Sequence, residues 1–139
     1  MRSILAVFSL IMMGLPAFAQ VALKVEVILN KPDAGGVLRI ALCPGKEAYN
    51  SEKGCRLQSV PATGRSAHSV FANVAPGEYG IKVFHDINSD NTLNTSWIGW
   101  PQEPYGFSND APVNMGPPSF KLAAITVKDK DSTTRIALR

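Results

Sequence analysis

Apolar and polar residues alternate along much of the chain, which is the pattern of β-strands with one buried face. The clearest case runs from Val21 to Leu29, where every second residue is Val or Leu. Further strands are predicted at shorter runs: 37–42, 56–60, 67–71, 79–84, 120–127 and 133–138. Turn residues separate these runs, and helix is expected only as short turns near 109–111 or 118–120. About seven short strands predict a single all-β domain, an antiparallel β-sandwich of the immunoglobulin-like or prealbumin-like kind.

Three segments interrupt the strand pattern. Residues 45–54 are polar and are predicted to be a loop that carries Tyr49, and residues 128–132 are predicted to be a polar hairpin turn. Segment 86–118 is longer and contains prolines at positions 101, 104, 112, 117 and 118. A loop of this length inside a compact domain is uncommon and often functional, so we expect the functional residues there.

The N-terminus carries the features of a secretory signal peptide over residues 1–19. Arg2 precedes an apolar run at 4–15, and an Ala-x-Ala pattern ends at Ala19. The alternative is a membrane anchor, but a bilayer-spanning helix needs roughly 20 apolar residues and this run is shorter. We therefore expect cleavage after Ala19 and a mature domain over residues 20–139 without a transmembrane segment. Such a protein would be periplasmic or secreted.

Charge and cysteine content restrict the partners and the compartment. The chain has 14 basic and 11 acidic residues, a net charge of +3, and its basic residues are scattered. No nucleic-acid partner is expected, because that would require a basic stripe. Cys43 and Cys55 are the two cysteines, and export favours a disulfide between them. The bridge would close a loop of about a dozen residues, worth about 3 kcal/mol. A metal site or a catalytic thiol is disfavoured because no histidine lies nearby in the sequence.

Oxygen-bearing side chains recur at every second position at the start of segment 86–118. They are Asp86, Asn88, Asp90, Thr92 and Asn94. Calcium takes roughly six to eight oxygen ligands, and this spacing resembles the EF-hand loop, which has a sharp turn at its sixth position. Asn91 occupies that position and tolerates the left-handed conformation. The twelfth position is Trp97 instead of a bidentate Glu. The pattern predicts a weak calcium site, and a solvated Asx-rich turn is the alternative.

Arrangements for catalysis are weak in this chain. His85 precedes Asp86, but neighbours on a strand face opposite ways, so His85 is expected to cap the end of the sheet with a hydrogen bond. Ser108 and Ser119 lack the Gly-x-Ser-x-Gly setting of a nucleophile. A glycoside hydrolase would need two well-placed carboxylates. Four candidates share one segment and keep this alternative open: Asp86, Asp90, Glu103 and Asp110.

Four aromatic residues also cluster in segment 86–118: Trp97, Trp100, Tyr105 and Phe107. Exposed aromatic side chains on an exported sandwich can stack on sugars or form a surface for a partner. The favoured interpretation is instead that they anchor the segment on the core, because a long loop needs apolar contacts. The exposure of the two tryptophans distinguishes these interpretations.

A series of motifs between residues 76 and 127 carries a family resemblance. In chain order they are Pro-Gly-x-Tyr at 76–79, His-Asp-x-Asn at 85–88, Pro-x-Glu-x-Tyr-Gly-Phe-Ser-Asn at 101–109 and Gly-Pro-Pro-Ser-Phe at 116–120. The chain resembles the bacterial family named domain of unknown function 2141 (DUF2141) over nearly all of residues 20–139. The Pro-Gly-x-Tyr motif also resembles transthyretin-like sandwich domains. The resemblance implies an exported bacterial protein without established activity and supplies no catalytic residue. Asn91 stands where the family more typically has Gly, and the cysteine pair is a local feature.

These observations lead to one functional hypothesis with two alternatives. We expect a non-enzymatic β-sandwich module of the cell envelope that binds a protein or glycan through segment 86–118, which a calcium ion would order. The first alternative is an envelope hydrolase that uses the carboxylates of that segment. The second is an accessory protein that binds carbohydrate through the aromatic cluster.

Overall fold

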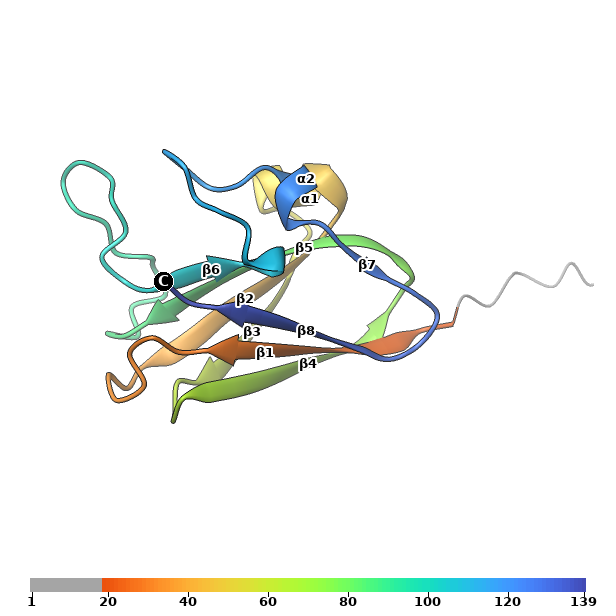
Figure 1. Ribbon diagram of the computed structural model, residues 1–139, viewed down its shortest axis with the longest axis horizontal. Helices are drawn as coiled ribbons and strands as arrows, with labels where there is room; N and C mark the ends of the chain where they lie inside the picture. Colours follow the sequence, from red (N-terminus) through yellow and green to blue (C-terminus); the bar gives the residue numbers. More distant parts are fainter. Residues whose placement is uncertain (1–18) are drawn as a thin grey trace, which may run out of the picture.

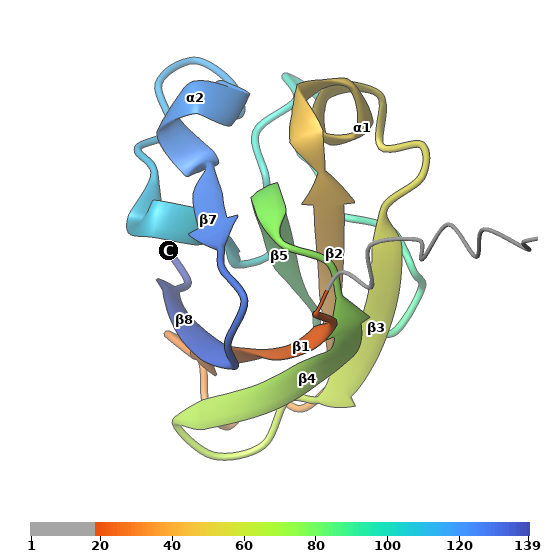
Figure 2. The ribbon, with the colours of Figure 1, turned by 90° about the vertical axis from the view of Figure 1, so that its right-hand side faces the viewer.

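Two β-sheets pack against each other in the protein (Figures 1 and 2). The computed structural model describes residues 19–139, so the predicted signal peptide lies outside the described residues except for Ala19. The smaller sheet has the strand order β4-β1-β8, and the larger has the order β3-β2-β5-β6, with β7 paired to β5. This arrangement confirms the predicted all-β sandwich.

Eight strands and three short helices make up the described residues. In chain order they are β1 (Val21–Ile28), β2 (Val37–Pro44), α1 (Gly45–Ser51), β3 (Arg56–Pro61), β4 (Ser66–Val74), β5 (Gly77–Asp86), β6 (Tyr105–Phe107), the 3-10 helix η1 (Ser108–Asp110), α2 (Phe120–Ala123), β7 (Ile125–Val127) and β8 (Ser132–Ala137). All strands except β6 overlap a predicted strand. Among residues 19–139, no helix combines the length and the apolar character needed to cross a bilayer.

The main core lies between the sheets and explains the alternation in β1. Val21, Leu23, Val25 and Val27 are buried, while the residues between them are exposed or half-buried. They share one apolar cluster with the inward-facing residues of the larger sheet: Leu38, Ile40, Leu42, Ile81 and Val83. Burying one such side chain contributes about 1.5–3 kcal/mol, so this cluster is the main force holding the sheets together.

A second, smaller cluster lies under helices α1 and α2, which sit side by side at one end of the sandwich (Figures 1 and 2). Tyr49 of α1 is buried there, 5.7 Å from the ring centroid of Phe120. Its hydroxyl donates a hydrogen bond of 3.1 Å to the carbonyl oxygen of Pro118. The sulfurs of Cys43 and Cys55 lie at bonding distance, 2.13 Å apart, as the sequence predicted. The bridge fastens the loop after α1 to β2.

The two open sides of the sandwich are closed in different ways. On one side, β6 meets the C-terminus through paired backbone hydrogen bonds between Tyr105 and Arg139, of 3.2 and 3.0 Å. On the other side, a side chain joins β3 to β4. The amide of Gln58 donates to the carbonyl oxygen of Val70 at 3.0 Å and accepts from the hydroxyl of Ser69. Both sheets therefore hold a fixed position relative to each other.

Three local predictions were wrong for reasons that lie outside local sequence. Residues 45–51 form helix α1 instead of a loop. The helical turn is favoured because it buries Tyr49 under α2. The predicted strand over 120–127 begins as helix α2 and narrows to β7. Residues 128–132 do not form a hairpin, since β7 pairs with β5 in the larger sheet and β8 pairs in parallel with β1 in the smaller one.

Candidate functional site

The candidate site is built on the outer face of the larger sheet. Side chains that alternate with the core residues point outward here and form two rows across four strands. The first row is Ser59, Arg39, Phe84 and Tyr105, and the second is Leu57, Ala41, Lys82 and Phe107. Gly106 lies between the two β6 residues and faces inward, where a Cβ would come within 2.8 Å of Ile136. The absence of a side chain there lets β6 lie close to β8.

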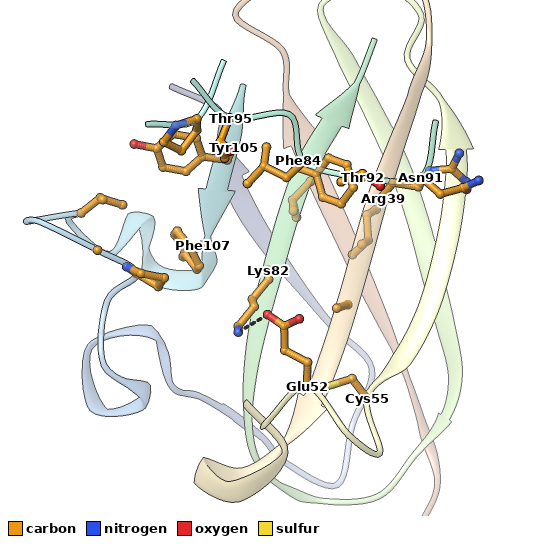
Figure 3. Close-up of a pocket in the computed structure, with 18 of the residues that line it drawn as sticks. Arg39, Glu52, Cys55, Lys82, Phe84, Asn91, Thr92, Thr95, Tyr105 and Phe107 are labelled. Atoms are coloured by element: carbon orange, nitrogen blue, oxygen red, sulfur yellow. Dashed lines mark hydrogen bonds and ion pairs between the residues drawn. The ribbon is translucent and has the colours of Figure 1, made fainter. Parts of the chain in front are cut away.

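Two parts of segment 86–118 stand over this floor and turn it into a groove. Residues 91–101 form one wall and residues 113–117 form the other. The enclosed volume is about 980 Å³, and Figure 3 shows floor and wall side chains around it. Its lining includes apolar side chains that water reaches, among them Leu57, Ile98, Trp100 and Met115. We call this feature the groove.

The wall at 91–101 is a small hairpin that presents tryptophan. The backbone N–H of Ser96 donates to the carbonyl oxygen of Trp100 at 2.8 Å, and Gly99 supplies the positive φ of 84° that the tight turn requires. Trp97 at the tip is 96% exposed, and Trp100 on the groove side is 61% exposed. The interpretation of the aromatics as core anchors is wrong for both tryptophans. It holds for Phe107, which is buried, and Tyr105 is half-buried in the floor.

Asp86 organises the start of the segment. Its side chain is fully buried, and Oδ2 accepts a hydrogen bond of 2.9 Å from Nε of Arg39 and lies 2.9 Å from Nη2 of the same guanidinium in an ion pair. The same carboxylate accepts the backbone N–H of Asp90 at 3.0 Å and that of Asn91 at 2.9 Å. Both oxygens of the buried carboxylate therefore accept hydrogen bonds, Oδ2 from Arg39 and Asn91 and Oδ1 from Asp90. Nothing in the sequence pattern marked Arg39 as its partner.

The remaining side chains of the predicted calcium set surround Asp90. Its carboxylate accepts from the backbone N–H of Thr92 at 2.9 Å and from the side-chain amides of Asn94 and Asn88 at 3.0 and 3.1 Å. The Asn94 hydrogen bond, followed by that of Thr92, lowers the pKa of Asp90. Asn91 adopts the left-handed conformation, with φ of 66°, as predicted for the sharp turn.

Calcium binding stays a prediction. Within residues 19–139, no group of three or more His, Cys, Asp or Glu side chains converges in a way that would hold a metal ion. N–H donors occupy the carboxylates of both Asp86 and Asp90, so an ion would have to displace Arg39 or the neighbouring amides. In this arrangement the hydrogen bonds themselves order the turn.

Glu103 ties the two ends of the turn together. It is buried, and its carboxylate accepts the backbone N–H of Ile87 at 2.8 Å and that of Asn94 at 3.0 Å. The sequence identified Glu103 only as one of four loop carboxylates. Its position between Pro101 and Pro104 is the one local signal for a rigid, structural role.

His85 lies on the opposite face of β5 from the groove. It is fully buried, and its Nε2 is 2.5 Å from the carbonyl oxygen of Gly35, which is the predicted hydrogen bond at the end of the sheet. Its Nδ1 has no hydrogen-bond partner within the described residues. Gly36 follows with φ of 76°, and a Cβ there would collide with the backbone of Asp86. The groove therefore contains no histidine.

Ser108 and its neighbours fasten the far end of the segment. The Ser108 hydroxyl accepts the N–H of Ile81 at 2.9 Å and donates to the carbonyl oxygen of Ala123. The Asn109 side chain donates to the carbonyl oxygen of Ala124 at 2.6 Å. These contacts use the polar groups of Ser108 completely, so it serves as a latch between β5 and α2.

The other end of the groove is closed by an ion pair. Nζ of Lys82 lies 2.7 Å from Oε1 of Glu52 (Figure 3). It also lies 4.6 Å from the ring centroid of Tyr49. Burial, and secondly the charge of Glu52, raises the pKa of Tyr49 to about 12. The disulfide at Cys55 holds this loop beside the groove. Both cations of the floor, Arg39 and Lys82, are thus neutralised by carboxylates.

The geometry can now be set beside known families. A family model described as "Uncharacterized protein conserved in bacteria (DUF2141)" matches residues 27–135. The chain belongs to this family. No curated protein and no solved structure matches it.

The DUF2141 motifs fall on the residues that hold the groove together. His85 and Asp86 lie at the end of β5, Glu103 fastens the turn, and Ser108 latches the segment to α2. The same motifs also supply part of the lining of the groove, namely Pro101, Tyr105, Phe107, Gly116 and Pro117, whereas Leu57 and Met115 lie outside them. In this DUF2141 protein the motifs therefore build the frame of the groove and part of its surface.

Proposed function

We propose that this DUF2141 protein is a non-enzymatic, exported module that binds a partner or ligand in the groove. The observation that carries the proposal is the group of water-accessible apolar side chains from separate elements that face one cavity. Leu57 comes from β3, Trp100 from one wall and Met115 from the other, and they are 76%, 61% and 96% exposed. An apolar patch that is gathered in a concave site is the usual mark of a binding surface.

The frame around the groove supports the binding proposal because hydrogen bonds within the protein hold it in place. Asp86, Glu103 and Ser108 each accept hydrogen bonds from the backbone of the segment or of β5. A binding surface that is already ordered loses little conformational entropy when the ligand arrives. Hydrogen bonds also engage the other two carboxylates that a hydrolase would use, Asp90 and Asp110, so no specific observation favours the hydrolase alternative.

Two features of the proposal rest on the sequence. Export rests on the predicted signal peptide at 1–19, and an exported location agrees with the disulfide at Cys43 and Cys55. Calcium has a direct test: the melting temperature of chelator-treated protein should rise at millimolar calcium, and Asp90→Asn should abolish the rise. An unchanged melting temperature would overturn the calcium prediction. A glycan ligand is the second candidate, favoured by the exposure of Trp97 and Trp100.

Amide chemical shifts measured with small probes test the binding function. Indole and cyclohexanol should shift the amide signals of residues around Ala41, Phe84 and Trp100. Ala41 lies in the middle of the floor, so Ala41→Trp should fill the groove and remove these shifts. Ala72→Trp is the matched control, because Ala72 is exposed on the outer face of β4 in the smaller sheet. Shifts that are spread over the surface, or that survive Ala41→Trp, would contradict the proposal.

A further inference from the structure

We propose that the occupant of the groove is an extended polypeptide segment of a partner protein, with apolar side chains and at least one Lys or Arg. This inference rests on the proposed binding function and names the class of ligand. Three properties of the groove support it, namely its length, its lining and the charge around it.

The length of the groove suits an extended chain. Its floor crosses four strands, β3, β2, β5 and β6. Neighbouring strands are about 4.8 Å apart, so the floor extends over about 14 Å, and an extended chain advances about 3.3 Å per residue. About four residues of a partner would therefore lie in the groove, with alternate side chains facing the floor.

The lining favours a polypeptide over a glycan or an acyl chain. Leu57, Ile98 and Met115 are exposed side chains of the lining, and they have no group that hydrogen-bonds to sugar hydroxyls. Trp, Tyr and Met are the side chains enriched at protein interfaces, and Trp100 and Tyr105 add them here. Both walls rise from loops and leave the groove open to water. An occupant of such an open groove needs one polar side and one apolar side. A peptide has both, because its backbone can face the solvent while its side chains face the floor.

The charge around the groove favours a cationic partner. Segment 86–118 contains four acidic residues and no Lys or Arg, while the rest of residues 19–139 contains 13 basic and seven acidic residues. Within the described residues, the ion pairs are Arg39–Asp86 and Lys82–Glu52, so both floor cations are neutralised. Asp90 is exposed, has no cationic partner, and directly precedes the lining residues Asn91 and Thr92. A Lys or Arg of the partner would complement this carboxylate at the rim of the groove.

Selection from a random peptide library tests the inference. The library is panned on the wild-type protein and depleted on Ala41→Trp, so that the surviving peptides depend on the groove. We expect the survivors to combine apolar residues with Lys or Arg. Affinity is then measured by titration of the best synthetic peptide, with tryptophan fluorescence as the signal. Ala41→Trp should weaken binding by about tenfold or more, as expected for blocking a central contact. Ala72→Trp should leave binding unchanged.

The charge contribution has its own matched pair of variants. Asp90→Asn should weaken binding of the cationic peptide by about threefold at low salt, because rim charges contribute modestly to affinity. This difference should vanish in about 1 M NaCl, where the screening length falls to about 3 Å. Asp129→Asn removes an exposed carboxylate from the 128–131 turn and should have no effect.

Four outcomes overturn the inference. The first is that no selected peptide depends on the groove, and the second is that the selected peptides contain no Lys or Arg. The third is that no peptide binds, while the protein binds to a glycan array and Ala41→Trp abolishes that binding. The fourth is that the protein forms a concentration-dependent dimer in which Trp100 is protected from quenching. If indole and cyclohexanol still bind the groove in these cases, the proposed binding function stands and only the ligand class is wrong. If the small probes also fail to bind, the function itself is wrong.

Discussion

The outer faces of the two sheets differ in their cover and in their side chains. On the smaller sheet, one row across the strands is His68, Glu26 and Arg135, which are polar and face water. On the larger sheet, the equivalent rows contain Leu57, Ala41 and Phe84 beneath segment 86–118. A sheet face without a cover has to be polar, whereas a partly covered face can carry apolar side chains. The contrast shows that segment 86–118 turns one outer face of the sandwich into a groove with apolar lining.

The largest effect should come from removing the carboxylate that holds the cover in place. Asp86→Ala leaves Arg39 without its partner and leaves the N–H groups of Asp90 and Asn91 unsatisfied. We expect a loss of about 3–5 kcal/mol in the free energy of unfolding, measured by urea denaturation, because one partner of a buried pair is deleted. Glu26→Ala on the uncovered face should change it by less than about 0.5 kcal/mol. Equal losses in the two variants would show that the two faces do not differ in this way.

The next largest effect concerns the closed end of the groove. Replacing Cys43 and Cys55 together by Ala opens a loop with a sequence separation of 12 residues. The free energy of unfolding should fall by about 3 kcal/mol, since the unfolded chain regains the entropy of that loop. Thermal denaturation of the double variant measures this loss. The wild-type protein in reducing agent should match the variant, and a melting temperature that is unaffected by reduction would contradict the prediction.

A smaller effect is expected at the second anchor of the turn. Glu103→Ala leaves the N–H groups of Ile87 and Asn94 without acceptors and should cost about 1–3 kcal/mol. Acrylamide should quench both tryptophans readily in the wild type, because Trp97 and Trp100 are exposed. In the variant, the distribution of fluorescence lifetimes of Trp100 should become broader, because the wall at 91–101 is held less firmly. Unchanged stability and lifetimes would mean that Glu103 does not hold the wall.

The smallest effect is a dependence on pH at the rim. The folded state lowers the pKa of Asp90 below its usual 3.8, so Asp90 stabilises the fold above that pH and loses this contribution as the pH falls through the lowered pKa. The melting temperature of Asp90→Asn should lie slightly below that of the wild type at neutral pH. The difference should shrink as the pH falls below 3.8 and disappear below the lowered pKa of Asp90, and Asp129→Asn should show no such trend. A constant difference at all pH values would contradict this assignment.

The parts of the fold that depend on local patterns were predictable. The alternation of Val21 to Leu29 predicted β1, and the same rule located most of the other strands. The positive φ of Asn91 and the hydrogen bond of His85 followed from residue type and position on the strand. Helix α1 was missed because it is stabilised by the burial of Tyr49 under α2. The residues that bury Tyr49 lie about 70 positions away in the chain.

The candidate site was only half visible in the sequence. The spacing of Asp86 and Asp90 predicted an ordered turn at the start of segment 86–118. The resemblance to DUF2141 pointed to the same part of the chain. The sequence did not show that Arg39 forms an ion pair with Asp86, or that the carboxylate of Glu103 accepts a backbone hydrogen bond from the turn. It also placed the tryptophans on the core, because composition alone does not tell an anchor from an exposed surface.

By itself, the sequence determined most of the strands, the cysteine pair and the ordered turn at the start of segment 86–118, because these depend on the period of the side chains and on the types of neighbouring residues. Only the tertiary structure decided which face of which sheet lies under segment 86–118. The groove combines Leu57, Phe84, Trp100 and Met115, which meet through strand pairing and long-range hydrogen bonds. Local periodicity carries no information about such pairings, and so the groove became visible only once the chain was folded.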